Sequence, residues 1–181
     1  MRLITLLLLS GVLAGCEKEL PVYSGTPLDR GGILYKPNSN EPLTARVERY
    51  YENGQLEILY TAIDGKKEGL QQRWYENGQL ELEFNSASGQ EEGLHQVWHE
   101  NGQLAQEVTF ANGKQEGLQQ VWYENGQLEL EVTFVNGKKE GLYQWWHKNG
   151  QLNVATTFAN GKIEGLYQWW HKNGQLNVAT T

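Results

Sequence analysis

The chain has 181 residues, 39% of them apolar, so its length and composition allow one ordinary domain. It carries 22 acidic and 15 basic residues, a formal net charge of −7, which makes nucleic acid a poor partner because DNA and RNA are polyanions. A single cysteine, Cys16, excludes an intrachain disulfide.

The first fifteen residues, MRLITLLLLSGVLAG, are predicted to be a signal peptide. One Arg precedes an apolar run that is too short to span a bilayer as a helix. The run ends in LAGC, which resembles the lipobox of bacterial lipoproteins, where the cysteine becomes a lipid-carrying amino terminus. The resemblance implies lipid on Cys16 and a place in the cell envelope, and Glu17 after the cysteine favours the outer membrane. A plain secreted protein with a reactive thiol is the alternative.

The following segment, residues 16–30, is interpreted as a tether between the lipid and the folded part of the chain. It contains Pro21 and Pro27, which favour an extended chain. Residues 31–181 are predicted to form a repeat array.

An internal repeat of 24 residues runs through that array. Asn-Gly-Gln-Leu recurs, a second glycine column usually stands in Asn-Gly-Lys, and Glu-Gly-Leu recurs once per period. Short segments rich in Trp, Tyr, Val and Phe separate the two Asn-Gly signals. This pattern predicts consecutive β-hairpins and no helix.

Both turn columns are predicted to be two-residue type I′ turns, because Asn tolerates and Gly accepts the positive φ that such turns require. In the first column the turn pairs are Asn53-Gly54, Asn77-Gly78, Asn101-Gly102, Asn125-Gly126 and Asn149-Gly150. With these turns His147 faces Leu152 and Trp145 faces Val154, while Asn160-Gly161 makes Val154 face Tyr167.

An even period keeps the same side chains on the same face in every repeat. The predicted apolar face collects Leu56, Ile58, Leu80, Leu82, Phe84, Val108, Phe110, Leu128, Leu130, Val132, Phe134, Leu152, Val154 and Phe158. The predicted polar face carries Glu81, Glu83, Glu107, Glu129, Glu131, Thr133, Thr157 and the glutamines Gln72, Gln96, Gln120 and Gln144. Gly93, Gly117 and Gly141 are predicted opposite Phe110, Phe134 and Phe158, where they are assigned to ring packing.

Segments such as EGLQQVWYENGQLELEVTFVNGKKEG are similar to MORN repeats, in particular to the bacterial variant often described as an antitoxin component of toxin–antitoxin systems. The resemblance covers residues 34–181 and implies stacked β-hairpins with no chemistry of their own. We therefore predict an all-β fold, an open twisted antiparallel meander. The last repeat is incomplete, and its uncovered strand, residues 175–181, is predicted to be able to pair with another chain.

The strongest candidate binding residues are the recurring tryptophans, which the predicted register places on the polar face: Trp74, Trp98, Trp122, Trp146 and Trp170. Successive rings should lie about 10 Å apart, since equivalent strands are separated by one other strand. A row of such rings could bind a peptide or a glycan. The simpler interpretation, which we favour, is that each Trp covers its own hairpin and a leucine, as Trp122 would cover Leu118.

The sequence predicts neither a metal site nor a catalytic site. His95 and His99 lie about 13 Å apart on one strand, too far for shared coordination. Glu81 with Glu83, and Glu129 with Glu131, are explained by alternation on a solvated face. No nucleophile or phosphate-binding motif is present, so no cofactor is expected.

Taken together, these features predict a lipid-anchored, non-enzymatic repeat scaffold that binds another macromolecule, with a protein as the expected partner. The resemblance implies an antitoxin, or an immunity-like role suited to the envelope. The alternative is a cell-wall or glycan-binding module that uses the tryptophans.

Overall fold

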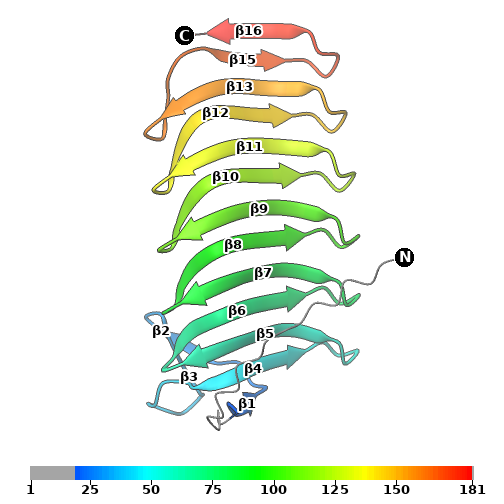
Figure 1. Cartoon of the computed structure of the whole chain (residues 1–181). Helices are drawn as coiled ribbons and strands as arrows, with labels where there is room; N and C mark the ends of the chain where they lie inside the picture. Colours follow the sequence, from blue (N-terminus) through cyan, green and yellow to red (C-terminus); the bar gives the residue numbers. More distant parts are fainter. Residues whose placement is uncertain (1–18, 181) are drawn as a thin grey trace, which may run out of the picture.

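The computed structural model describes residues 19–180, which form one long sheet and a small hairpin (Figure 1). The sheet is fourteen-stranded, and its hairpin-linked strands follow one another in chain order, which confirms the predicted all-β antiparallel meander. Its strands are β1 (Val22–Tyr23), β4 (Ala45–Tyr50), β5 (Leu56–Ile63), β6 (Lys66–Trp74), β7 (Leu80–Ala87), β8 (Gln90–Trp98), β9 (Leu104–Ala111), β10 (Lys114–Trp122), β11 (Leu128–Val135), β12 (Lys138–Trp146), β13 (Leu152–Ala159), β14 (Lys162–Ile163), β15 (Tyr167–Trp170) and β16 (Leu176–Thr180). Residues 19–180 contain no helix that could cross a membrane.

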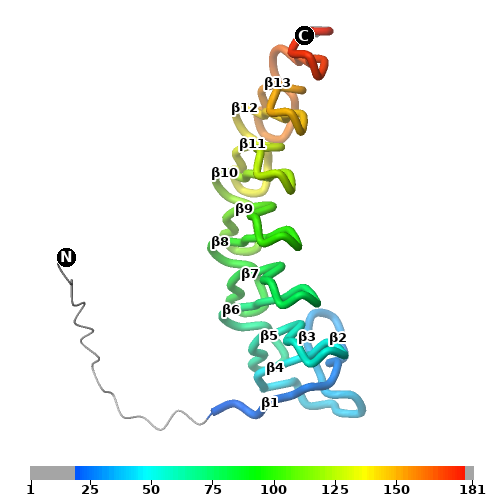
Figure 2. The backbone as a smooth tube through the Cα atoms, turned by 90° about the vertical axis from the view of Figure 1, so that its right-hand side faces the viewer, coloured from blue at the N-terminus to red at the C-terminus, as the bar shows by residue number. Residues whose placement is uncertain are grey.

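Seen along its edge, the array is a single layer of strands (Figure 2). Among the residues that the structure describes, other segments cover only its N-terminal end. There β1 pairs with β4 in parallel, and the hairpin of β2 (Leu28–Arg30) and β3 (Ile33–Tyr35) lies beside the first strands (Figures 1 and 2). Leu43, Ala45, Val47 and Ala62 form the buried cluster of this end.

The segment predicted as a tether, residues 16–30, therefore supplies β1 and β2 to the fold. The backbone N–H of Arg46 also donates to the Pro21 carbonyl at 3.0 Å. Whether this segment acts as a tether stays a prediction, and Cys16 and the signal peptide lie outside the described residues.

The two turn columns differ in type. In the second column, Asn160 (φ 50°) and Gly161 (φ 81°) are both left-handed and Ala159 pairs with Lys162, which confirms a two-residue type I′ turn. In the first column that prediction is wrong. Gly78 N–H donates to the Tyr75 carbonyl at 2.9 Å and Tyr75 N–H to the Gln79 carbonyl at 2.8 Å, a three-residue loop in which glycine alone has positive φ.

Beyond the loop, the strands β12 and β13 still pair in the predicted register, because a bulge compensates for the extra loop residue. Trp145 pairs with Val154 as predicted, but Trp146, not His147, pairs with Leu152, since the register shifts by one residue at that point. On the other side of β13, Val154 pairs with Trp169 instead of Tyr167. This shift of two residues leaves the side chains of β13 and β15 on their predicted faces. The one-residue shift beside the Asn-Gly loop does not, and it makes the prediction for Glu81 wrong: Glu81 bonds to Arg73, which pairs with Leu82 on the apolar face.

That second shift comes from a bulge at each Glu-Gly-Leu segment. Between β11 and β12, for example, Val132 pairs with Tyr143 and Thr133 with Glu140, so the intervening Gly-Leu pair is skipped. Gly117 stands opposite Phe134 as predicted, but a Cβ placed on it would meet no atom within 4 Å. Its φ of 79° is the reason for glycine, so the assignment to ring packing is wrong.

The apolar face agrees with the sequence pattern. Val108 and Val132 are fully buried, and Phe134 and Val154 are nearly so, whereas Glu131, which pairs with Gln120 on the other face, is half-buried. Glu129 is skipped by the register shift beside the loop. Burial and, to a smaller extent, the charge of Glu129 raise the pKa of Tyr143, which pairs with Val132 on the apolar face, so the predicted place of Glu129 on the polar face is wrong. His95, also on the apolar face, stacks on Phe84 with ring centroids 5.0 Å apart.

Candidate functional site: the polar face of the sheet

The polar face presents three parallel rows of side chains that cross the strands. Strands β6, β8, β10 and β12 each contribute a leucine, a glutamine and a tryptophan at alternate positions, so all three point to one face. Leu166, just before β15, and Trp170, at its end, occupy the equivalent positions in the last repeat. We call these the leucine row (Leu70, Leu94, Leu118, Leu142 and Leu166), the Gln–Glu row (Gln72, Glu83, Gln96, Glu107, Gln120 and Glu131) and the tryptophan row (Trp74, Trp98, Trp122, Trp146 and Trp170).

The leucine row is the most exposed regular apolar feature of the array. Its five side chains are between 44% and 54% exposed. Each follows a glycine of the bulge, and Leu118 pairs with Thr133 on the polar face. The sequence pattern predicts that Trp122 covers Leu118. Leu118 is 47% exposed, so about half of it remains in solvent.

The Gln–Glu row consists of one Gln–Glu hydrogen bond across each of the strand pairs β6–β7, β8–β9 and β10–β11. The amide of Gln72 donates to Glu83 at 2.6 Å, and the pairs Gln96–Glu107 and Gln120–Glu131 repeat the bond at 2.8 Å. Within residues 19–180, none of these three carboxylates forms an ion pair. The row loses its charge beyond Glu131, because Ala155 takes the next carboxylate position.

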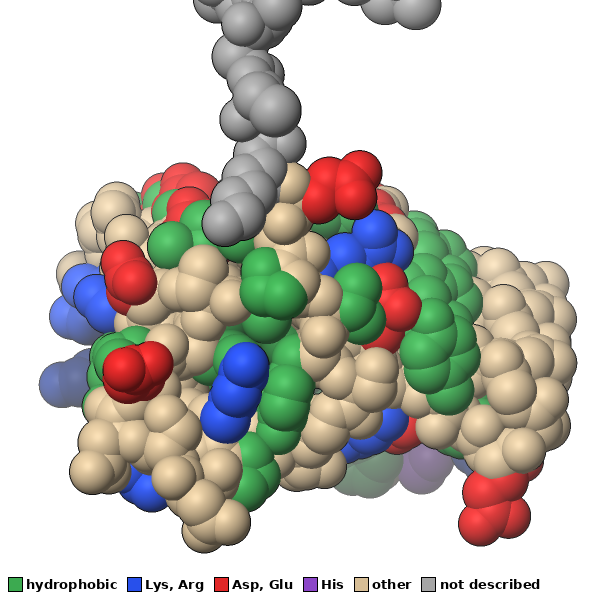
Figure 3. All heavy atoms as spheres, turned by 90° about the horizontal axis from the view of Figure 1, so that it is seen from below, with side chains coloured by type: hydrophobic (Ala, Val, Ile, Leu, Met, Phe, Trp, Pro, Cys, Tyr) green, Lys and Arg blue, Asp and Glu red, His purple; other side chains and the backbone are tan. Residues whose placement is uncertain are grey.

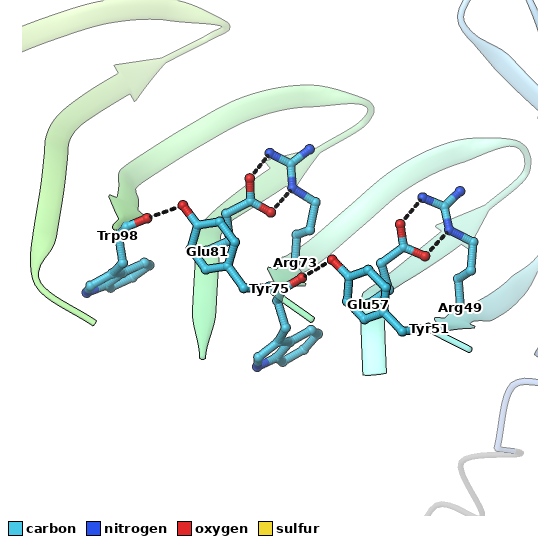
Figure 4. A network of polar contacts seen from close by, with 8 residues as sticks. Arg49, Tyr51, Glu57, Arg73, Tyr75, Glu81 and Trp98 are labelled. Carbon is cyan, nitrogen blue, oxygen red and sulfur yellow. Dashed lines mark hydrogen bonds and ion pairs between the residues drawn. The ribbon is translucent and has the colours of Figure 1, made fainter. Parts of the chain in front are cut away.

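The tryptophan row is half-buried, and its backbone is fixed by the preceding repeat. The hydroxyl of Tyr75 donates to the Trp98 carbonyl at 2.7 Å, and Tyr51 and Tyr123 make the same bond to Trp74 and Trp146. His99 Nε2 lies 2.8 Å from the Trp122 carbonyl, which can only accept. Figure 4 shows the Trp98 indole pointing away from the Tyr75 hydroxyl and its neighbours.

Two arginine–glutamate pairs flank these bonds at the N-terminal end of the array (Figure 4). Arg49 contacts Glu57 through two hydrogen bonds of 2.7 Å, and Arg73 contacts Glu81 at 2.6 and 2.8 Å. The hydrogen bonds from Arg49 lower the pKa of the Glu57 carboxyl. Both pairs reach solvent, so their energetic contribution is small.

The turn asparagines, predicted as turn formers, also join successive repeats. Asn77 Oδ1 accepts from the Gln79 N–H at 2.9 Å, and its Nδ2 donates to the Glu100 carbonyl of the next repeat at 3.0 Å. Asn53, Asn101, Asn125 and Asn149 make the equivalent bond 23 residues ahead. At the other edge, Glu92 accepts from the Asn112 N–H at 2.8 Å, and Glu68, Glu116 and Glu140 do the same.

The structure also holds a cavity of about 320 Å³ where the N-terminal segment meets the apolar face. Its walls include Leu34, Tyr60 and Phe84. Figure 3, which looks at this end of the molecule, shows hydrophobic side chains interleaved with charged ones. The cavity belongs to the packing of the N-terminal segment, since it lies between that segment and the strands.

Among residues 19–180, no three His, Cys, Asp or Glu side chains cluster so as to hold a metal ion. His95 lies among aromatic rings, where burial lowers its pKa, and the nearest Glu91 oxygen is 3.9 Å away.

Sequence reasoning named the tryptophans and expected them to cover the leucines, but it missed the exposure of the leucine row and the bonds between repeats. The leucine signal was visible, since a Leu follows the same glycine in each period on a face that is otherwise polar.

The comparisons with known proteins agree with this architecture. The profile of the family described as MORN repeat variant matches residues 43–63, 67–86, 91–112, 115–136, 139–160 and 163–181. No curated protein matches the chain. MORN repeats are non-catalytic modules that generally bind proteins or membranes. With six matched repeats covering most of its length, the chain belongs to the MORN repeat variant family.

Proposed function

We propose that this protein is a lipid-anchored, non-enzymatic scaffold that binds a protein partner on the polar face of its sheet. One observation carries the binding part of the proposal: a single-layer sheet holds five leucines about half exposed in a row, and the first three lie beside carboxylates that lack ion pairs within residues 19–180. Regular exposed apolar surface next to polar groups marks interaction sites.

A photocrosslinking amino acid at Leu94, in cells that produce the full chain, tests the binding proposal. The matched control carries the same group at Glu124, an exposed turn position away from the leucine row. We expect a discrete crosslinked protein from Leu94 and none from Glu124. Equal crosslinking at both positions, or none at either, would contradict the proposal.

The lipid anchor rests on the sequence, where an apolar segment ends in LAGC at the lone Cys16. More than one acyl chain would hold the protein firmly at a membrane, which a single chain does not. Metabolic labelling with a fatty acid analogue should mark the wild type and leave Cys16→Ser unlabelled and released from the outer membrane fraction. An unlabelled wild-type chain would rule out the anchor.

An immunity-like role in the envelope is the specific form of the proposal that the family resemblance supports. A chain exported with a lipid anchor can meet only toxins that act in the envelope. The role predicts that the protein crosslinked at Leu94 inhibits growth when it is exported without this chain, and that co-production restores growth. A crosslinked protein without such toxicity would exclude it.

A glycan-binding module is the second candidate, favoured by half-buried indoles repeated about every 10 Å. Cell-wall glycan should then retain the wild type and lose the double variant Trp98→Ala, Trp122→Ala. Unchanged retention would remove this candidate.

Edge pairing between copies is a separate proposal. In residues 19–180 the sheet ends at β16, whose outer side is unpaired. Strand addition there would make the sedimentation coefficient rise with protein concentration, and a constant monomeric value would refute it.

A further inference from the structure

We infer that the polar face between Leu70 and Glu131 binds a basic amphipathic α-helix whose axis runs along the leucine row. This inference rests on the proposed protein-binding function and names the chemistry of the partner.

The apolar part of the surface is made by Leu70, Leu94 and Leu118, which are 45%, 45% and 47% exposed. They lie on β6, β8 and β10, each two strands from the next. Their spacing is about 9.6 Å, twice the distance between neighbouring strands. A partner must therefore present an apolar side chain about every 10 Å along a line that crosses the strands.

The charged part of the surface is the line of Glu83, Glu107 and Glu131 in the Gln–Glu row. Each accepts one bond from a neutral glutamine amide, and within residues 19–180 none is paired with a cation. From residue 70 to residue 131 the chain has eleven Glu against one Arg and one Lys, and that Arg, Arg73, already contacts Glu81. Charge complementarity therefore requires basic side chains on the partner.

An α-helix matches both spacings. Seven residues of helix rise about 10.5 Å, within about 1 Å of the distance between successive leucines. The leucine and carboxylate lines are two residues apart along each strand, or about 7 Å, and a helix about 10 Å wide can contact both. A polyproline chain also repeats every 9 to 10 Å, at about 3.1 Å per residue over three residues, but it is too narrow to follow both lines.

The partner sequence follows from this match. It has an apolar residue at every seventh position and Lys or Arg about four residues after each, because residues i and i+4 lie on one side of a helix. About 18 residues cover the three leucines.

The array contains its own negative control. Leu142 is 54% exposed and sits in the same kind of bulge, but the carboxylate position nearest to it in the following strand is Ala155. From residue 132 to residue 181 the chain has five Lys and two Glu. A basic helix should therefore avoid this half of the leucine row.

The test uses the full chain in detergent and a synthetic capped peptide of about 18 residues, with Leu at every seventh position and Lys four residues after each, on an Ala and Gln background. Fluorescence anisotropy measures binding, with detergent alone as the blank. The first control peptide has the same composition in scrambled order. The second has the designed sequence with a central Pro that breaks the helix. We expect binding of the designed peptide only, weakened by added salt.

Chain variants locate the site. Leu94→Asp should weaken binding about tenfold or more, because it places a charge in an apolar contact. Glu107→Gln should weaken it about two- to fivefold, the effect of one exposed ion pair. Leu142→Asp, at a site of matched exposure, should stay within about twofold.

The inference is overturned if the scrambled or Pro-containing peptide binds equally well, if Leu142→Asp weakens binding as much as Leu94→Asp, or if no peptide binds. The peptide controls use the wild-type chain, so they test the inference even if a protein variant misfolds. If Leu94 crosslinks to a protein but no peptide binds, only the inference of a helical partner is refuted. If Leu94 does not crosslink and no peptide binds, the proposed protein-binding function is refuted as well.

Discussion

Replacing Gly117 by Ala measures why a glycine recurs in every Glu-Gly-Leu segment. Gly117 has φ 79°, and a Cβ on it would touch nothing within 4 Å, so Ala meets only the backbone penalty of the left-handed region, about 1–2 kcal/mol. Ala also reduces the freedom of the unfolded chain, which offsets about 0.4–1 kcal/mol. The expected net loss of stability is therefore about 1 kcal/mol.

Gly117→Asn separates the backbone explanation from ring packing against Phe134. Asn tolerates positive φ better than Ala although it is larger, so it should cost less than Ala, about 0.5 kcal/mol. Gly65→Ala is the contrasting case, because its Cβ would lie 2.9 Å from the Leu34 carbonyl oxygen and should cost more than either change.

Urea unfolding of the full-length variants, followed by circular dichroism, gives these differences in the free energy of unfolding. The reasoning fails if Gly117→Asn costs more than Gly117→Ala, since a size effect would then outweigh the backbone effect. It also fails if Gly117→Ala reaches the roughly 3 kcal/mol typical of severe overpacking.

Three further changes test the framework, and urea unfolding checks each. Asn101→Asp keeps the acceptor of the turn but loses the amide bond to the next repeat, so it should lower the free energy of unfolding by about 0.5–1.5 kcal/mol. An equal loss from Asn173→Asp, whose Nδ2 bonds within its own turn, would show that the bond between repeats is not what stabilises the array. Burial lowers the pKa of His95, so the unfolded chain takes up the proton first and stability should fall as pH drops below about 6.5. The variant His95→Gln should lose this pH dependence. An unchanged pH profile in the variant would show that His95 is not its source. Val132→Ala should lower the free energy of unfolding by about 2–3 kcal/mol because Val132 is fully buried, whereas Glu131→Ala should lower it by less than about 1 kcal/mol. A larger loss from Glu131→Ala would mean that the buried and exposed faces are assigned the wrong way round.

The sequence alone determined the repeat, the hairpins and the two faces. Positions such as Asn160-Gly161 favour a single turn type, and alternation about them places Val132 and Val154 on one side of the sheet. These features depend on residues close together in the chain, whose local preferences agree in every period. The tryptophans could be named as candidates for the same reason.

Tertiary structure decided what joins the repeats and what remains exposed. The bond from Asn77 to the Glu100 carbonyl and the bond from Tyr75 to Trp98 span 23 residues, so no local pattern reveals them. At Gly117 and Leu118, β10 keeps its pairing with β11 but shifts its register against β9, which only the assembled sheet shows. Leu118 in this bulge is half exposed. Exposure depends on which strands and segments lie beside a residue, and this is set only when the whole sheet is assembled.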